Sequence, residues 1–136
     1  MLLFKTFITT FIFGFFLDLI WLALIAKNLY DRQIGFLLKK VNGSLTPNWW
    51  AAGIVYLAII GGIFYFALPK AGAGWTQALL QGAVFGLVTY SIYDFTNYAL
   101  IANWPFMITI IDVTWGIVLC GSITLAAYLL RSWFGA

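Results

Sequence analysis

Three of the four acidic residues, Asp18, Asp94 and Asp112, lie within long apolar stretches of the sequence. An aspartate at the centre of a membrane-spanning helix costs about 2.5–3.5 kcal/mol, so a position facing lipid would be strongly unfavourable. Carboxyl groups that lie close together inside a membrane protein cannot all be ionised. A cluster of them would hold protons or attract a cation, and an acid that burial keeps protonated could act on an apolar substrate. The candidate catalytic residues are therefore Asp94, Asp112 and Asp18.

Two of these acids are each followed by a tryptophan three residues later. The pattern Asp18-x-x-Trp21 recurs as Asp112-x-x-Trp115. Their ring faces, with those of nearby tyrosines, could stack on a cationic or flat apolar ligand. The repeated pair is compatible with an inverted repeat of the kind found in transporters, and equally with coincidence. The candidate ligand-binding residues are Asp18, Trp21, Tyr56, Tyr90, Tyr93, Asp94, Asn97, Asp112 and Trp115.

The sequence lacks the residues that several common catalytic and metal-binding sites require. Histidine and glutamate are absent and Cys120 is the only cysteine, which excludes Ser-His-Asp and Cys-His nucleophiles, a disulfide framework and ordinary zinc sites. We therefore predict neither a cofactor nor a metal ion. The seven basic residues stand between apolar stretches rather than in one patch, so no nucleic-acid partner is expected.

The composition is that of a membrane protein. Of the 136 residues, 64% are hydrophobic and only 8% are charged, too few charges to cover the surface of a soluble fold. Four apolar stretches are each long enough to cross ~30 Å of hydrocarbon, and they predict four transmembrane helices in a single domain, residues 1–136. Tryptophans such as Trp49, Trp75 and Trp133 stand at their ends, as in an interfacial aromatic belt. The predicted spans cover residues 3–26, 48–68, 75–102 and 106–130.

The only long connection, between the first two spans, is predicted to form a short helix over residues 28–42 that lies on the membrane surface. A disordered loop is the alternative. Arg32 and Lys39 fall on one side of this helix, which ends near Gly43. The predicted fold is thus an all-α integral membrane protein, a four-transmembrane-helix bundle with a short interfacial amphipathic helix between helices 1 and 2. The apolar face of that short helix consists of Tyr30, Ile34, Leu37, Leu38 and Val41.

The three buried acids are predicted to share one level of the bundle. Because spans alternate in direction, each carboxyl group lies about 10–12 Å below the surface on the side of the first loop. Tyr56 of the second span reaches the same level. The alternative is structural, with hydrogen-bonded aspartates that only hold the helices together. Small residues on the same helix faces are the candidates for helix packing, and two of them, Gly82 and Gly86, could instead form a homodimer contact. These packing residues are Gly14, Gly82, Gly86 and Gly116.

Several segments together carry a resemblance to a known family. They are Leu17 to Leu22, Tyr30 with Gly35, Gly86 to Tyr90, Tyr93 to Ala99, Trp104-Pro105 and Asp112 to Gly116. Over nearly its whole length the chain resembles the small bacterial membrane proteins called domain of unknown function 2177. The resemblance implies a four-helix, multi-pass protein of the bacterial inner (cytoplasmic) membrane, and it carries no established activity. Phe95 stands where leucine is expected, an exchange between apolar residues.

Three functions remain open from the sequence. The preferred hypothesis is a protein that binds or transports a proton, a cation or a cationic or apolar small molecule at Asp18, Asp94 and Asp112. The second is an enzyme that acts on a lipid or isoprenoid, with Asp94 or Asp112 as the acid or base. The third is a structural or accessory subunit. The expected partners are the lipid bilayer, a small-molecule, lipid or cation ligand, and a second copy of the chain.

Overall fold

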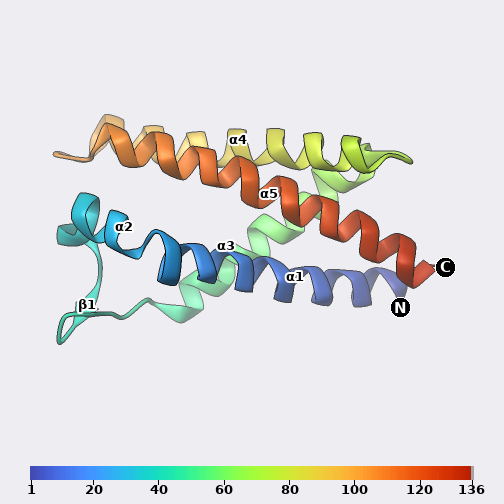
Figure 1. The fold of residues 1–136 in the computed structure, drawn as a ribbon, viewed down its shortest axis with the longest axis horizontal. Coiled ribbons are helices and arrows are strands. Elements are labelled where there is room, and N and C mark those ends of the chain that lie inside the picture. The colour runs from blue at the N-terminus through green and yellow to red at the C-terminus, as the bar shows by residue number, and fades with distance from the viewer. Residues whose placement is uncertain (136) are drawn as a thin grey trace.

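The computed structural model describes residues 1–135 and contains four helices that are long and apolar enough to cross a membrane. The prediction of four spans is therefore confirmed. Both chain termini lie at one end of the bundle, and α2 lies at the other (Figure 1). The last helix continues past residue 130, because residues 131–134 contain neither proline nor glycine. The spans are Leu2–Ile25, Trp49–Ala71, Trp75–Leu100 and Phe106–Gly135.

The first two spans each end in an irregular turn, whereas the last two are regular helices. The first consists of α1 (Leu2–Ile20) followed by a π-helical turn, η1 (Trp21–Ile25). The second consists of α3 (Trp49–Gly62), a π-helical turn η3 (Ile63–Ala67) and a 3-10 turn η4 (Leu68–Ala71). The third and fourth spans are α4 (Trp75–Leu100) and α5 (Phe106–Gly135). Single π-helical turns occur frequently at functional sites.

Helices α4 and α5 form the most closely packed pair, side by side along the bundle (Figure 1). A Cβ atom at Gly86 would overlap the backbone of Gly116, and one at Gly82 would overlap Thr124 and the carbonyl of Cys120. Glycine therefore permits this approach, as in other membrane helix pairs. Since Gly82 and Gly86 are buried within the chain, they are not available for the predicted homodimer contact.

A dry core fills the middle of the bundle. Ile60 and Ile63 of the second span pack there with Leu119, Cys120 and Ile123 of α5, and all five are almost fully buried. Helix α1 joins this core through Gly14, where an added Cβ atom would lie 2.8 Å from Ile123 Cδ1. The first half of α3 stays outside the core, because Ile60 is the only buried residue in α3.

The connection between α1 and α3 differs in part from the prediction. The amphipathic helix α2 (Lys27–Ile34) is present, with a 3-10 turn η2 (Gly35–Leu37) after it, but it is shorter than residues 28–42. The rest is a hairpin of β1 (Lys40–Val41) and β2 (Ser44–Leu45), joined by Asn42 and Gly43, both with positive φ. Asn-Gly favours such two-residue turns. The prediction that Leu37 and Val41 share a helix face is therefore wrong.

Helix α2 covers the ends of α4 and α5 rather than standing apart from them. Ile34 is buried against Trp104 and Ile108, while Tyr30 and Leu38 pack beside them. The apolar face of the predicted helix thus turns toward the bundle at Tyr30, Ile34 and Leu38. This contact encloses the region where the acidic residues lie.

Candidate functional site

Asp18 joins three helices. Its side chain lies on the buried face of α1, where Thr6, Thr10, Gly14 and Asp18 follow one another at intervals of four residues. One carboxyl oxygen accepts a hydrogen bond from the Tyr56 hydroxyl of α3 at 2.5 Å. The other accepts one from the Trp115 indole N–H of α5 at 2.8 Å. Asp18 therefore has a donor on each oxygen and is held in one position.

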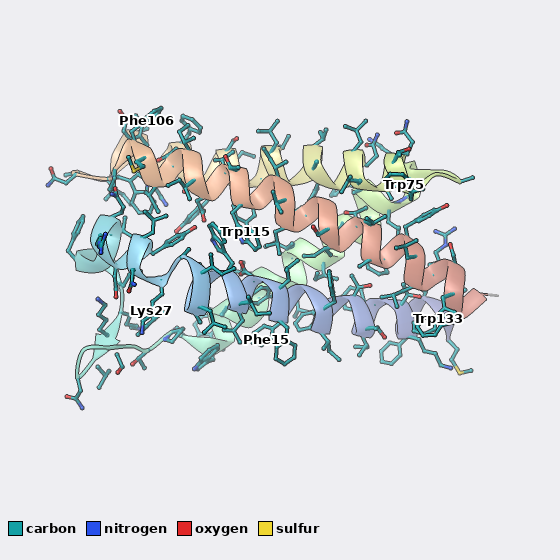
Figure 2. All side chains as sticks on the ribbon, in the orientation of Figure 1. Phe15, Lys27, Trp75, Phe106, Trp115 and Trp133 are labelled. Atoms are coloured by element: carbon teal, nitrogen blue, oxygen red, sulfur yellow. The ribbon has the colours of Figure 1, made fainter. Side chains whose placement is uncertain are left out.

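Trp115 continues this arrangement toward α2. Its ring stacks on Trp21 of η1, with centroids 4.5 Å apart and an angle of 9° between the planes. Figure 2 shows Trp115 between the ribbons of α5 and α1. The Trp21 indole N–H points to the Tyr30 hydroxyl at 3.4 Å, and that hydroxyl in turn donates to Asp112. The π-helical turn thus brings Trp21 into contact with both α5 and α2.

The Tyr30 hydroxyl is a proton donor that is hard to ionise. Burial is the largest cause that raises its pKa above the ordinary 10, and the negative charge of Asp112 adds to it. Tyr30 therefore keeps the proton that it donates in its hydrogen bond to Asp112. This bond ties α2 to α5.

Asp94 has a different environment. It is only 1% exposed, and neither of its carboxyl oxygens accepts a hydrogen bond from an N–H or hydroxyl donor within residues 1–135, while the Asp112 carboxyl group lies beside it. It faces a cavity of about 220 Å³, which we call the α2 cavity because α2 closes it. The residues that line the α2 cavity are Tyr30, Ile34, Leu38, Tyr93, Asp94, Trp104, Ile108 and Asp112.

A larger cavity of about 400 Å³ lies between α3 and α4. Val55 of α3 and Tyr93 of α4 stand at its walls and are 54% and 58% exposed, so the cavity opens on the side of the bundle. We call it the lateral cavity. It is lined by Asp18, Leu22, Val55, Ile59, Thr89, Tyr90, Tyr93, Asp112 and Trp115. It exists because the first half of α3 does not pack against α4.

The three acids are therefore distributed over two cavities. Asp18 and Asp112 line the lateral cavity, Asp94 and Asp112 line the α2 cavity, and Asp112 belongs to both. All seven lysine and arginine side chains are exposed and none lines either cavity, so the described chain offers the acids no basic partner there. Within residues 1–135, no three histidine, cysteine, aspartate or glutamate residues gather as a metal site would require.

The structure places all but one of the predicted ligand-binding residues in the cavity walls or in the hydrogen bonds and aromatic stack described above. Asn97 lines neither cavity. Several residues of the cavity walls were not predicted as site residues, among them Tyr30 and Trp104. Tyr30 carried a signal, because a hydroxyl on the apolar face of an amphipathic helix needs a partner when it is buried. Trp104 stands next to the start of a predicted span, where a tryptophan is typical of the interfacial belt and does not indicate a site.

The comparisons with known proteins identify the family. The family model described as "Predicted membrane protein (DUF2177)" matches residues 3–129. The chain therefore belongs to this family of membrane proteins, as the resemblance in its sequence implied. No curated protein and no solved structure matches it.

Proposed function

We propose that the protein binds a lipophilic cation, which enters the lateral cavity sideways from the membrane. The observation that carries the proposal is an apolar cavity that opens between two spans and has two carboxyl groups in its wall. A cavity of about 400 Å³ is within the usual range for small-molecule sites.

The walls suit the apolar part of such a molecule. Leu22, Val55 and Ile59 provide aliphatic surface, and Tyr90 and Trp115 provide aromatic surface. Because the opening lies beside the first half of α3, at the level of a membrane span, an apolar molecule could enter without crossing water. Mostly apolar walls with a few polar groups are typical of ligand sites.

The carboxyl groups favour a positive charge. Asp18 already accepts two hydrogen bonds, whereas only one oxygen of Asp112 accepts a bond from Tyr30. Asp112 is therefore the group we expect to meet the cation, with Asp18 adding negative charge behind it. Aromatic faces beside these acids stabilise a cation further. No lysine or arginine lines the cavity to compete with it.

Binding of tetraphenylphosphonium to the purified protein in detergent tests the proposal. We expect saturable binding to the wild type, and Asp112→Asn should weaken it at least ~10-fold, about 1.4 kcal/mol. Val55→Trp should weaken it too, because the larger ring narrows the opening. Asp31→Asn is the matched control, since Asp31 is exposed and lines neither cavity. Unchanged binding in a folded Asp112→Asn variant would refute the proposal.

A second candidate is an enzyme that acts on a lipid or isoprenoid. It is favoured by Asp94, because an acid that is 1% exposed and receives no hydrogen bond from an N–H or hydroxyl donor in the described chain can be kept protonated by burial. Overexpression should then change the cellular lipid composition, and Asp94→Asn should reverse the change. An identical lipid composition with both proteins would eliminate this candidate.

A further inference from the structure

The α2 cavity contains a carboxyl group that receives no hydrogen bond from an N–H or hydroxyl donor within residues 1–135. This group is Asp94, which is buried there, and Asp112 faces the same space. A buried polar atom without a hydrogen bond is costly, and a buried charge without a partner is more so. The carboxyl group must therefore hold a proton or meet a ligand that donates hydrogen bonds.

The chemistry of the cavity favours an ammonium group over a bound divalent metal ion. Its wall has two carboxyl groups, so calcium or magnesium would have to take most of its six or more oxygen ligands from water. The cavity of about 220 Å³ is also much larger than the ~30 Å³ that one water molecule occupies. A small organic cation fits this space better than a single ion.

The remaining walls complete such a site. The rings of Tyr93 and Trp104 meet edge to face, with centroids 6.4 Å apart, and Tyr30 of α2 lines the same cavity. Aromatic faces attract ammonium groups, and Ile34 and Ile108 can cover a short alkyl chain. A primary ammonium has three N–H donors, so it can serve both oxygens of Asp94 and one of Asp112.

We propose that the α2 cavity is a second binding site, which shares Asp112 with the lateral cavity and takes a primary ammonium group between Asp94 and Asp112. Its walls come from α2, α4 and α5 and from the connecting segments at Leu38 and Trp104, with no contribution from α1 or α3. The ammonium group belongs either to a free alkylamine or to the headgroup of an aminophospholipid. Both sources have the chemistry that the cavity recognises.

Isothermal titration calorimetry of the protein in phosphatidylglycerol nanodiscs, which contain no amine, tests this site with propylammonium. We expect saturable binding, at least ~10-fold weaker for tetramethylammonium because a quaternary ammonium has no N–H to donate. Asp94→Asn should weaken propylammonium binding by a similar factor, and Ile34→Phe should weaken it by filling the cavity. Asp31→Asn, the exposed aspartate, is the matched control and should bind as the wild type does.

Adding phosphatidylethanolamine to the nanodiscs identifies the source of the amine. A lower apparent affinity for propylammonium would mean that the lipid headgroup occupies the site, and an unchanged affinity would mean that the site takes free amines. Failure of propylammonium to bind the wild type, or equal binding by tetramethylammonium, would overturn the proposal. If Asp94→Asn does not fold, Ile34→Phe decides, and full binding by that variant also overturns it.

Discussion

The bundle has two parts that are built from the same helices but held together by different contacts. One part extends from the apolar core to the end at which the chain termini lie, and the other lies beneath α2. In the first part, Gly82 and Gly86 let α4 approach α5, and aliphatic side chains such as Ile60 and Ile123 fill the core. In the second, hydrogen bonds and one aromatic stack connect the helices around two cavities. The comparison suggests that close packing at one end permits an open, polar arrangement at the other.

The largest loss of stability is expected from a substitution that forces α4 away from α5. Gly86→Ala places a methyl group against the backbone of Gly116, so we expect a loss of about 1–3 kcal/mol in unfolding free energy, with loosening of both parts. Thermal unfolding in detergent measures the loss. Gly61→Ala is the control, because an added Cβ atom there meets nothing within 4 Å. Equal stability of the two variants would mean that the close approach contributes little.

A smaller effect is expected from a change confined to the part beneath α2. Tyr30→Phe removes the hydrogen bond to Asp112 but keeps the ring, so it should cost about 0.5–1.5 kcal/mol. The loss should be local and appear as faster amide hydrogen exchange in α2, while α4 and α5 exchange as before. Tyr65→Phe, at a residue that is 76% exposed, should change nothing. Faster exchange throughout the bundle would contradict the division into two parts.

The smallest effect on stability is expected at Asp31, the one exposed aspartate. Lys40 Nζ lies 2.8 Å from Asp31 Oδ1, and this hydrogen-bonded ion pair lowers the pKa of Asp31 below its ordinary 3.8. A lowered pKa means that the pair stabilises the fold above pH ~3.8 and that this contribution disappears as the pH falls through the lowered value. Because both side chains are solvated, we expect a slight change that salt screens.

That change can be measured as the difference in melting temperature between wild type and Asp31→Asn from pH 3 to pH 7, at low and high salt. The difference should be small, largest at neutral pH and low salt, and smaller toward the acid end. A difference that grows toward acid pH would contradict the assigned sign.

The spans were predictable because each depends on local properties, namely apolar length and turn residues such as Pro105. The acidic residues could be located for a similar reason, since an aspartate in an apolar stretch is conspicuous. Asn42-Gly43 is typical of a hairpin turn, but the helical spacing of the apolar residues from Tyr30 to Val41 predicts a helix over the same segment. The Asn-Gly turn and the extended backbone after Leu37 are what ended the helix.

The division into two cavities could not be predicted, because it depends on how the helices diverge. The first half of α3 stands away from α4, and no pattern within either helix specifies that separation. The contacts of Tyr30 with Asp112 and of Trp104 with Ile34 likewise join segments far apart in the chain. Local periodicity indicates which face of a helix is buried, but it does not indicate which partner covers that face.

Asp112 lies in the walls of both cavities, and this has a thermodynamic consequence. Two ligands that share one carboxyl group cannot bind independently, and the factor by which the first alters the affinity of the second equals the reverse factor. Titrating tetraphenylphosphonium against propylammonium, in either order, must therefore give one coupling constant. Because both ligands are cations that draw on the same negative charge, that constant should report antagonism.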